Sequence, residues 1–212
     1  MATEFLISSK LKRQVTENVQ RLERVVVNRE TLRPAAVAIV ITSTQDDDEA
    51  CVLLTLRSAT IKRHAGQYAL PGGRMEVGES AEQTALREME EEIGLRVAPD
   101  QVVGCLDDFA TRSGFRITPV VVWGGRNVDL LPDPNEVERV FHIPLAELNR
   151  PDVPQMITER STQNQVISAL LPTLGHRIYA PTIAMLYQFR EVALRNQMTR
   201  VGHYEQPQFA WR

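Results

Sequence analysis

The chain has 212 residues, of which 43% are hydrophobic and 24% are charged, and its formal net charge is -3. This composition is typical of a globular domain with a substantial core, and the small negative charge gives no electrostatic reason to expect a nucleic-acid partner. No apolar run is long enough to span a bilayer, and the polar N-terminal residues lack the apolar core of a signal peptide. We therefore expect a cytoplasmic protein that binds neither nucleic acid nor membrane.

The first part of the chain contains a predicted helix and a predicted β-hairpin. Apolar residues recur every three or four positions over residues 10–24, which is typical of an amphipathic helix. Two β-branched runs, 35–42 and 51–56, flank a polar turn and therefore predict two paired strands. Cys51 and Cys105 stand far apart in apolar runs, so we expect reduced core thiols rather than a disulfide or a metal pair.

Local signals define both ends of a predicted helix over residues 81–93. Ser80 is a favourable N-terminal cap, and Gln83 three residues later completes a capping box. The segment contains neither glycine nor proline, and Gly94 supplies a left-handed stop. The buried face of this helix is predicted to carry Leu86, Met89 and Ile93.

Glu88, Glu91 and Glu92 stand at positions i, i+3 and i+4, so their carboxylates share one face of this helix. Like charges at this spacing repel by about a few tenths of a kcal/mol per pair, and a bound cation would remove the repulsion. Carboxylate oxygens suit Mg2+ or Mn2+. A solvated acidic face is the alternative, but the preceding glycine-rich turn and the spaced Glu79 and Arg87 favour a metal site.

Along its whole length the chain mixes strands with a few helices, which favours an α/β layered domain. Pro119 lies inside one apolar run and indicates a bulge or an edge position there. Residues 150–178 are predicted to be irregular or to form short hairpins, and Pro181 opens a helix that extends to about residue 195. Strands are predicted over residues 102–109, 115–123 and 136–143.

Residues 73–95 resemble the signature box of the Nudix hydrolases. Every fixed position of G-x5-E-x7-R-E-U-x-E-E-x-G-U, where U is apolar, is matched by GRMEVGESAEQTALREMEEEIGL. Residues 53–73 resemble the extended signature of the coenzyme A (CoA) diphosphatase branch, L-L-T-x-R-[S/A]-x3-R-x3-G-x3-F-P-G-G. Lys62 stands in place of the second arginine of this pattern, and Leu70 stands in place of its phenylalanine. The resemblance implies an α/β/α sandwich with a mixed β-sheet.

The resemblance also implies hydrolysis of a diphosphate with Mg2+ or Mn2+. The implied metal ligands are Glu88, Glu91 (directly or through water), Glu92 and the carbonyl oxygen of Gly73. Arg87 would orient these carboxylates and would itself pair with Glu79, with an ordinary surface ion pair as the alternative reading of these two residues. Such hydrolysis needs charge neutralisation and a positioned water rather than a covalent nucleophile.

Residues outside the box are candidates for binding phosphate and for activating water. Arg57 and Arg63, with Lys62 beside the latter, suit the phosphates of a CoA-like ligand, because guanidinium groups bind phosphate through paired hydrogen bonds. The alternative is that they are surface cations after a strand. Glu136 and Glu138 are the candidates outside the box for the general base, with plain strand-edge charges as the alternative.

These features predict a CoA or acyl-CoA diphosphatase that releases 3′,5′-ADP and 4′-phosphopantetheine. The alternatives are a Nudix hydrolase of ADP-ribose, nucleotide sugars or oxidised nucleoside triphosphates, and a Nudix domain that binds nucleotides without catalysis. We expect an N-terminal helical extension over residues 1–30, a Nudix domain over 31–200 and a C-terminal tail over 201–212. A homodimer is compatible with the resemblance, since the N-terminal helix and Trp211 can face a partner as well as the chain's own core.

Overall fold

The computed structural model describes residues 5–44, 47–59, 66–158 and 165–207. Two residues predicted to bind phosphate, Lys62 and Arg63, lie outside the described residues, as does Trp211. No helix within the described residues is long and apolar enough to cross a membrane.

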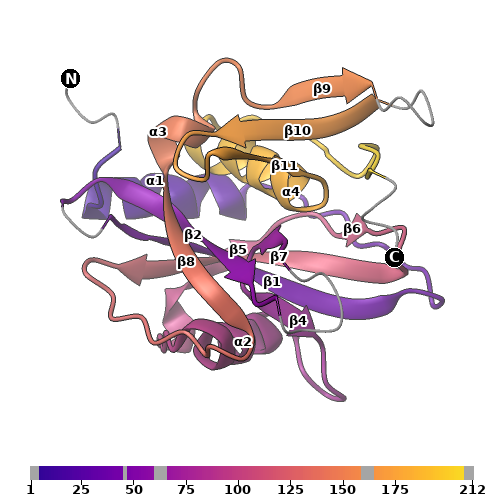
Figure 1. Cartoon of the computed structure of the whole chain (residues 1–212), viewed down its shortest axis with the longest axis horizontal. Coiled ribbons are helices and arrows are strands. Elements are labelled where there is room, and N and C mark those ends of the chain that lie inside the picture. The colour runs from indigo at the N-terminus through magenta and orange to yellow at the C-terminus, as the bar shows by residue number, and fades with distance from the viewer. Residues whose placement is uncertain (1–4, 45–46, 60–65, 159–164, 208–212) are drawn as a thin grey trace.

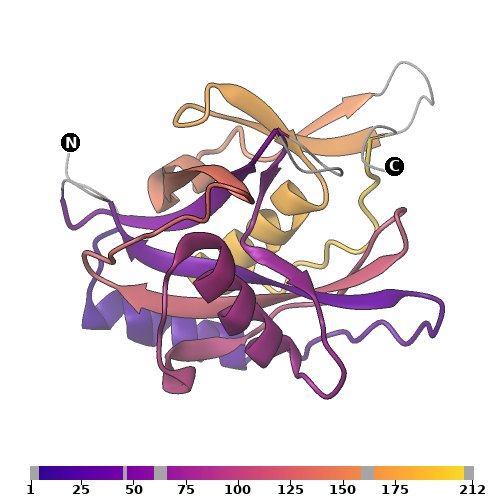
Figure 2. The same cartoon turned by 60° about the horizontal axis from the view of Figure 1, so that its bottom comes forward.

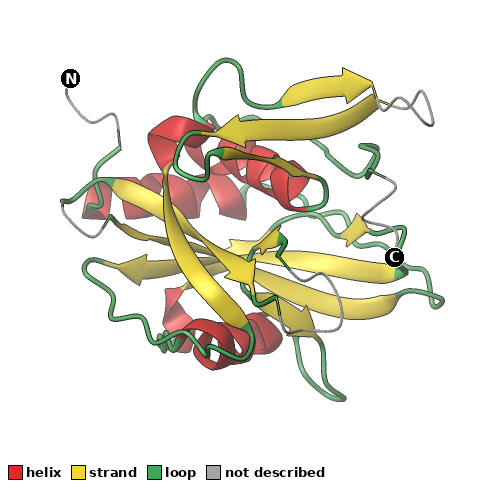
Figure 3. Ribbon diagram, viewed as in Figure 1, coloured by secondary structure: helices red, strands yellow, loops and turns green. Residues whose placement is uncertain are grey.

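A central β-sheet lies between two layers of helices (Figure 1, Figure 3). Helix α2 (Ala81–Ile93) covers one face of the sheet, and helices α1 (Ser9–Gln20) and α4 (Thr182–Phe189) cover the other (Figure 2). Each layer buries its apolar side against the sheet, which is the usual reason for such an architecture. The predicted α/β/α sandwich is therefore confirmed.

Within the described residues, eight strands form one mixed sheet. They are β1 (Arg33–Ser43), β2 (Ala50–Arg57), β3 (Tyr68–Ala69), β4 (Gly72–Arg74), β5 (Val102–Cys105), β6 (Phe109–Ala110), β7 (Phe115–Gly125) and β8 (Val137–Pro144). Strands β1 and β7 run parallel, and the other pairs of this sheet are antiparallel. The pairing of β1 with β2 confirms the predicted hairpin.

Strand β1 is buried on both faces, which explains its almost continuous apolar sequence. Ala38 and Val40 pack with α2, while Ile39 and Ile41 point into the larger core beneath α1 and α4. This alternation follows the two-residue period of a strand. Helix α1 contributes Val15 to the larger core, so the residues expected as an N-terminal extension share the core of the sheet.

The chain from β3 to β4 runs between the diverging ends of β1 and β2. Strand β3 pairs with β2, and β4 pairs with β1. At Gly72 a side chain would overlap the Ala36 carbonyl and Val37 of β1, so the close approach of the two strands requires glycine. This route brings the Gly72–Gly73 turn beside α2.

A second, smaller antiparallel sheet lies beside α4 (Figure 1). Its strands within the described residues are β9 (Gln155–Thr158), β10 (Gln165–Leu171) and β11 (His176–Tyr179). Strand β10 pairs with both neighbours. Of the irregular structure or short hairpins predicted over 150–178, the short hairpins are confirmed, since these strands stabilise one another by antiparallel pairing.

The single strand predicted over residues 102–109 is wrong, because β5 and β6 are separated by a break. In this break the buried Asp108 carboxylate accepts hydrogen bonds from Arg24 and from the Thr118 hydroxyl, at 2.6 Å each. Pro119 of β7 lies opposite the break, so its missing N–H costs no ladder hydrogen bond. Of the two alternatives predicted for Pro119, the edge position is wrong, because β7 is an interior strand, whereas an interrupted ladder lies opposite the proline.

The remaining helical segments differ modestly from their predictions. Helix α1 is shorter than residues 10–24, because it ends at Gln20 and a turn at Arg21 leads into irregular chain. Helix α4 continues as a π-helical turn over Arg190–Leu194, close to the predicted end near residue 195. A 3-10 turn (Pro99–Gln101) and the short helix α3 (Leu145–Leu148) complete the described helices.

Candidate active site

Helix α2 begins and ends where its local sequence requires. The Ser80 hydroxyl accepts a hydrogen bond from the Gln83 backbone N–H at 3.2 Å, and the Gln83 side chain accepts one from the Ser80 N–H at 2.8 Å. Gly94 ends the helix in the left-handed conformation, with φ of 69°. The predicted capping box and helix bounds are confirmed, and they fix the direction of each glutamate on the helix.

One face of α2 packs against the sheet. Met89 and Ile93 are fully buried, as predicted, whereas Leu86 is only partly buried. Ala81 and Ala85 take the remaining buried apolar positions of the helix, and their small side chains allow it to lie close to β1. The glutamates of the box lie beside this packed face, next to the turn that contains β4.

Arg87 binds three carboxylates. Its Nε and Nη2 atoms donate to the two Glu79 oxygens at 2.8 and 3.1 Å, the paired arrangement that guanidinium groups favour. Its Nη1 atom donates to Glu88 at 2.8 Å and to Glu91 at 2.9 Å, and Nη2 also donates to the Arg74 carbonyl at 3.1 Å. The structure thus brings together four of the side chains predicted from the box.

Glu79 connects the loop before α2 to the helix itself. Besides the Arg87 bonds, its carboxylate accepts hydrogen bonds from the Glu76 backbone N–H at 2.9 Å and from the Thr84 hydroxyl at 2.7 Å. The Arg87 hydrogen bond, followed by those from Glu76 and Thr84, lowers the pKa of Glu79 to about 2. Glu79 is therefore charged at neutral pH. Thr84 is a partner that the sequence analysis missed, since its spacing from Glu79 carries no recognised signal.

Glu92 is buried, with 1% of its surface exposed. Its carboxylate accepts a hydrogen bond from Arg57 Nη1 at 3.0 Å and another from the Gly72 backbone N–H at 3.1 Å. Burial raises the pKa of Glu92 to about 7, against the opposing effects of the Arg57 charge and the Gly72 amide. Arg57, predicted to bind phosphate, is thus the partner of a box carboxylate in this structure.

Glu88 lies against the glycine turn. A Cβ atom added to Gly73 would overlap the Glu88 carboxylate, so only glycine leaves room for this contact. Burial is the largest influence on the pKa of Glu88 and raises it, Arg87 opposes this effect, and the charges of Glu91 and Glu136 raise it further. Glu136 is therefore close enough to act electrostatically on the site. Both Glu136 and Glu138 are exposed, and Glu138 lies on β8.

The oxygen atoms of this site suit a hard divalent cation. Glu88 and Glu92 are about one helical turn apart, and the Gly72–Gly73 turn contacts both of them. Arginines neutralise these carboxylates in the structure, and within its described residues no three acidic, histidine or cysteine side chains converge as a metal cluster. The donor set fits Mg2+ or Mn2+, which would compete with Arg87 and Arg57 for the same oxygens.

Comparisons with known proteins bear on the family of this chain. The NUDIX domain matches residues 32–163. The uncharacterized Nudix hydrolase NudL of Escherichia coli K12 is 36% identical over 128 residues, which are 60% of this chain and 66% of NudL. Nudix hydrolase 22 (chloroplastic) of Arabidopsis thaliana is 39% identical over 116 residues, which are 53% of this chain and 38% of that protein.

The chain therefore spans just under two thirds of NudL and a smaller share of the Arabidopsis protein. Among solved structures, the MutT protein from Methanosarcina mazei Go1 is 24% identical and has a TM-score of 0.43, over 63% of this chain and 88% of that one. The domain match over more than half of the chain and the fully matched box carry the assignment. The chain belongs to the Nudix family.

Proposed function

We propose that this protein hydrolyses a diphosphate linkage with the help of Mg2+ or Mn2+. The contact of one glycine turn with two carboxylates of α2 supports this proposal most directly, because Gly72 donates to Glu92 and Gly73 lies against Glu88. Hydrolysis of a diphosphate requires neutralised charge and a positioned water rather than a covalent nucleophile. An oxygen-rich site beside arginines meets that requirement.

Glu88 and Glu92 would be the principal metal ligands, together with the Gly73 carbonyl. Glu91 would bind directly or through water, which suits its position, since 57% of its side chain is exposed against 15% for Glu88 and 2% for Glu92. When bound, the cation neutralises phosphate charge and lowers the pKa of a water molecule.

Arg87 and Glu79 would act as positioning residues. Arg87 holds Glu88 and Glu91 through one Nη1 atom, and Glu79 fixes the guanidinium plane through the other two nitrogens. Because hydrogen bonds keep the pKa of Glu79 near 2, this anchor stays charged throughout the neutral range. Partners of metal ligands commonly influence affinity and activity in this way.

Glu136 is the stronger candidate for the general base. Its charge acts on Glu88, and it lies in the turn just before β8, where its carbonyl accepts a hydrogen bond from the Ser58 N–H at 2.9 Å. In this role its carboxylate would take a proton from the attacking water. Glu138, exposed on β8, is the alternative.

We infer CoA or an acyl-CoA as the substrate from the sequence before the box. Residues 53–73 follow the extended signature of CoA diphosphatases at most fixed positions. Cleavage of the CoA diphosphate gives 3′,5′-ADP and 4′-phosphopantetheine, and Arg57, with Lys62 and Arg63, would bind the phosphates. The departures at Lys62 and Leu70 support a second candidate, a hydrolase of ADP-ribose, nucleotide sugars or oxidised nucleoside triphosphates.

A side-by-side substrate panel tests this choice. The purified chain is given Mg2+ and equal concentrations of CoA, ADP-ribose, a nucleotide sugar and an oxidised deoxynucleoside triphosphate, and the products are resolved by chromatography. We expect the highest kcat/KM for CoA, with 3′,5′-ADP as a product, and no turnover in EDTA. Turnover of CoA no faster than that of ADP-ribose would refute the CoA assignment, and Mg2+-independent turnover would refute the metal site.

A further inference from the structure

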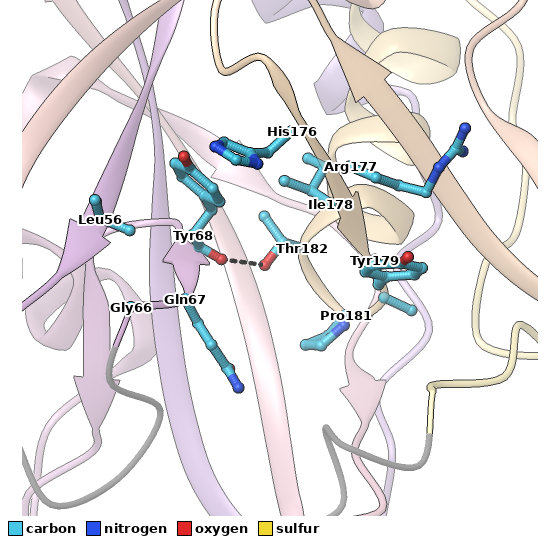
Figure 4. Close-up of a pocket in the computed structure, with 11 residues that line it drawn as sticks. Leu56, Gly66, Gln67, Tyr68, His176, Arg177, Ile178, Tyr179, Pro181 and Thr182 are labelled. Atoms are coloured by element: carbon cyan, nitrogen blue, oxygen red, sulfur yellow. Dashed lines mark hydrogen bonds between the residues drawn. The ribbon is translucent and has the colours of Figure 1, made fainter. Parts of the chain in front are cut away.

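A cavity of about 450 Å³ lies between β3 and the segment that joins β11 to α4 (Figure 4). Its apolar walls come from Leu56 on one side and from Ile178 and Pro181 on the other. Tyr68 and His176 stand at one end of the cavity, with ring centroids 6.0 Å apart and planes inclined by 32°. The residues that line this cavity thus include three aromatic rings, since Tyr179 adds to these two, and one charged side chain, that of Arg177.

The cavity lies on the face of the sheet opposite α2. Along β2, Leu53 packs with the α2 side and Leu54 with the α1 and α4 side, and side chains of a strand alternate, so Leu56 shares the side of Leu54. The chain passes from Tyr68 at the cavity to Gly72 at the carboxylate site within roughly 13 Å of extended backbone. One nucleotide-containing substrate can therefore reach both places around the end of β3.

A row of side chains extends the cavity across three strands. In the strand register, Leu56 pairs with Tyr68 of β3 and with Arg139 of β8, so the three side chains share one face. The Arg139 guanidinium lies 4.8 Å from the centroid of the Phe141 ring, and that ring meets Tyr68 edge to face at 5.6 Å. Arg139 does not line the cavity itself, but it is a cation on the same face of the sheet as Tyr68 and is linked to that ring through Phe141.

Arg139 differs from the arginines of the carboxylate site. Arg57 and Arg87 each bind a carboxylate, whereas Arg139 is exposed and has no carboxylate partner among the described residues. A stacked guanidinium without an acidic partner is well suited to a phosphate group. The backbones of Tyr68 and Arg139 are two strand spacings apart, roughly 10 Å. A nucleotide whose base lies against Tyr68 and whose ribose carries a phosphate near Arg139 would fill this distance.

We propose that this cavity binds the adenine of the substrate and that Arg139 binds the phosphate monoester on the adenosine ribose. The site would then select a 3′-phosphorylated adenosine, as in CoA, over an adenosine without that phosphate, as in ADP-ribose. Aromatic side chains stabilise bases by stacking, and the arginine adds a charge-assisted hydrogen bond. The inference rests on the proposed diphosphate hydrolysis for the identity of the ligand, but its residues are separate from those of the hydrolytic site.

Binding without turnover tests the role of Arg139. Calorimetry of the metal-free protein compares adenosine 3′,5′-bisphosphate with AMP, which lacks only the 3′-phosphate. We expect the wild-type protein to prefer the bisphosphate by roughly tenfold or more, and Arg139→Gln to remove most of that preference. Arg126→Gln, at an exposed arginine paired with Asp48, is the control and should keep the preference for the bisphosphate. No preference in the wild-type protein, or an undiminished preference in Arg139→Gln, would overturn the proposal.

The role of Tyr68 is tested with two variants that separate stacking from folding. Tyr68→Leu should lower the affinity for both ligands by roughly tenfold. Tyr68→Phe keeps the ring and should bind both ligands as tightly as the wild-type protein does. If Tyr68→Leu fails to fold, the test rests on Tyr68→Phe. Retained binding of both ligands by this variant would support stacking on the ring, and a loss of binding in the folded variant would count against stacking. Full binding by a folded Tyr68→Leu variant would place the base elsewhere.

Steady-state kinetics separate this inference from the proposed function. For the wild-type protein the ratio of kcat/KM for CoA to that for dephospho-CoA should be roughly ten or more, and Arg139→Gln should bring the ratio close to one. If CoA is not hydrolysed but the bisphosphate preference depends on Arg139, the proposed substrate fails and the cavity assignment stands. If CoA is hydrolysed and Arg139→Gln leaves the ratio unchanged, the cavity assignment fails alone.

Discussion

Arg57 Nη1 donates to Glu92 Oε1 at 3.0 Å, across 35 positions of sequence. This bond joins the end of β2, which belongs to the upstream signature, to the last turn of α2, which belongs to the box. Because Glu92 is buried, its charge depends on this partner in the absence of a cation. A cation at Glu92 would replace that partnership and leave Arg57 available to a substrate phosphate.

The first prediction concerns this exchange of partners. Arg57→Gln should lower kcat/KM for the best substrate by roughly tenfold or more, because a charged phosphate contact is lost. It should not weaken Mn2+ binding, since the arginine competes with the cation for Glu92. Calorimetric titration of the free protein with Mn2+ checks this second part. Weaker Mn2+ binding in a folded Arg57→Gln variant would show that Arg57 supports the metal site instead.

The second prediction concerns Glu79, which fixes Arg87 through two hydrogen bonds. Glu79→Gln should lower kcat by roughly tenfold to a hundredfold, the usual effect of removing the partner of a ligand-orienting group. The concentration of Mg2+ at half-maximal activity should also rise, which a purely structural role would not require. Glu90→Gln is the matched control, because Glu90 lies on the same helix and, among the described residues, its carboxylate pairs only with the exposed Arg96. Equal effects of the two variants would contradict the positioning role.

The third prediction concerns stability at the break between β5 and β6. Asp108 is completely buried and binds Arg24, the Thr118 hydroxyl and the Val27 backbone N–H. Asp108→Asn should lower the free energy of unfolding by about 2 kcal/mol, because it removes the buried charge that Arg24, whose side chain is 29% exposed, and the Val27 N–H bind. Urea unfolding measures this quantity, and Asp152→Asn is the control because Asp152 belongs to an exposed ion pair. Its free energy of unfolding should differ from that of the wild-type protein by less than about 1 kcal/mol. Similar values for both variants would mean that the Asp108 network contributes little.

The fourth prediction concerns the two free thiols. Burial raises the pKa of both Cys51 and Cys105 to about 12, so both stay protonated at neutral pH. Alkylation of the native protein near pH 8 should therefore be far slower than that of free cysteine, and unfolding in urea should expose both. Since the unfolded thiols ionise first, stability should fall as the pH rises from about 9 toward 12. Rapid modification of the folded chain would contradict this burial.

Helix α2 could be predicted to the residue because its determinants are local. Ser80, Gln83 and Gly94 define its ends within a few positions, and the spacing of the glutamates follows from the helix period. The Arg87–Glu79 pair was also within reach, since the family resemblance includes both residues. Leu86 packs against the same core as Met89 and Ile93 but is less buried than predicted, a difference of degree that the helix period does not determine.

Contacts between distant segments could not be predicted. The break at Asp108 depends on Arg24 from the N-terminal segment and on Thr118 from β7, and neither is near it in sequence. The cavity beside Tyr68 depends in the same way on β11, in a region predicted to be irregular or hairpin-like. Such features arise from packing between elements, which periodicity and propensity do not determine.

Glu92→Gln tests the central claim of metal-dependent hydrolysis most directly. The substitution keeps the size of the side chain and one of the two oxygens that accept from Arg57 and from the Gly72 amide, but it removes the carboxylate charge that a cation needs. With Mg2+ and the best substrate of the panel, we expect kcat to fall by more than roughly a hundredfold, because a ligand should matter at least as much as its outer partners. Circular dichroism should show an intact fold. Unchanged turnover in a folded Glu92→Gln protein would contradict the claim.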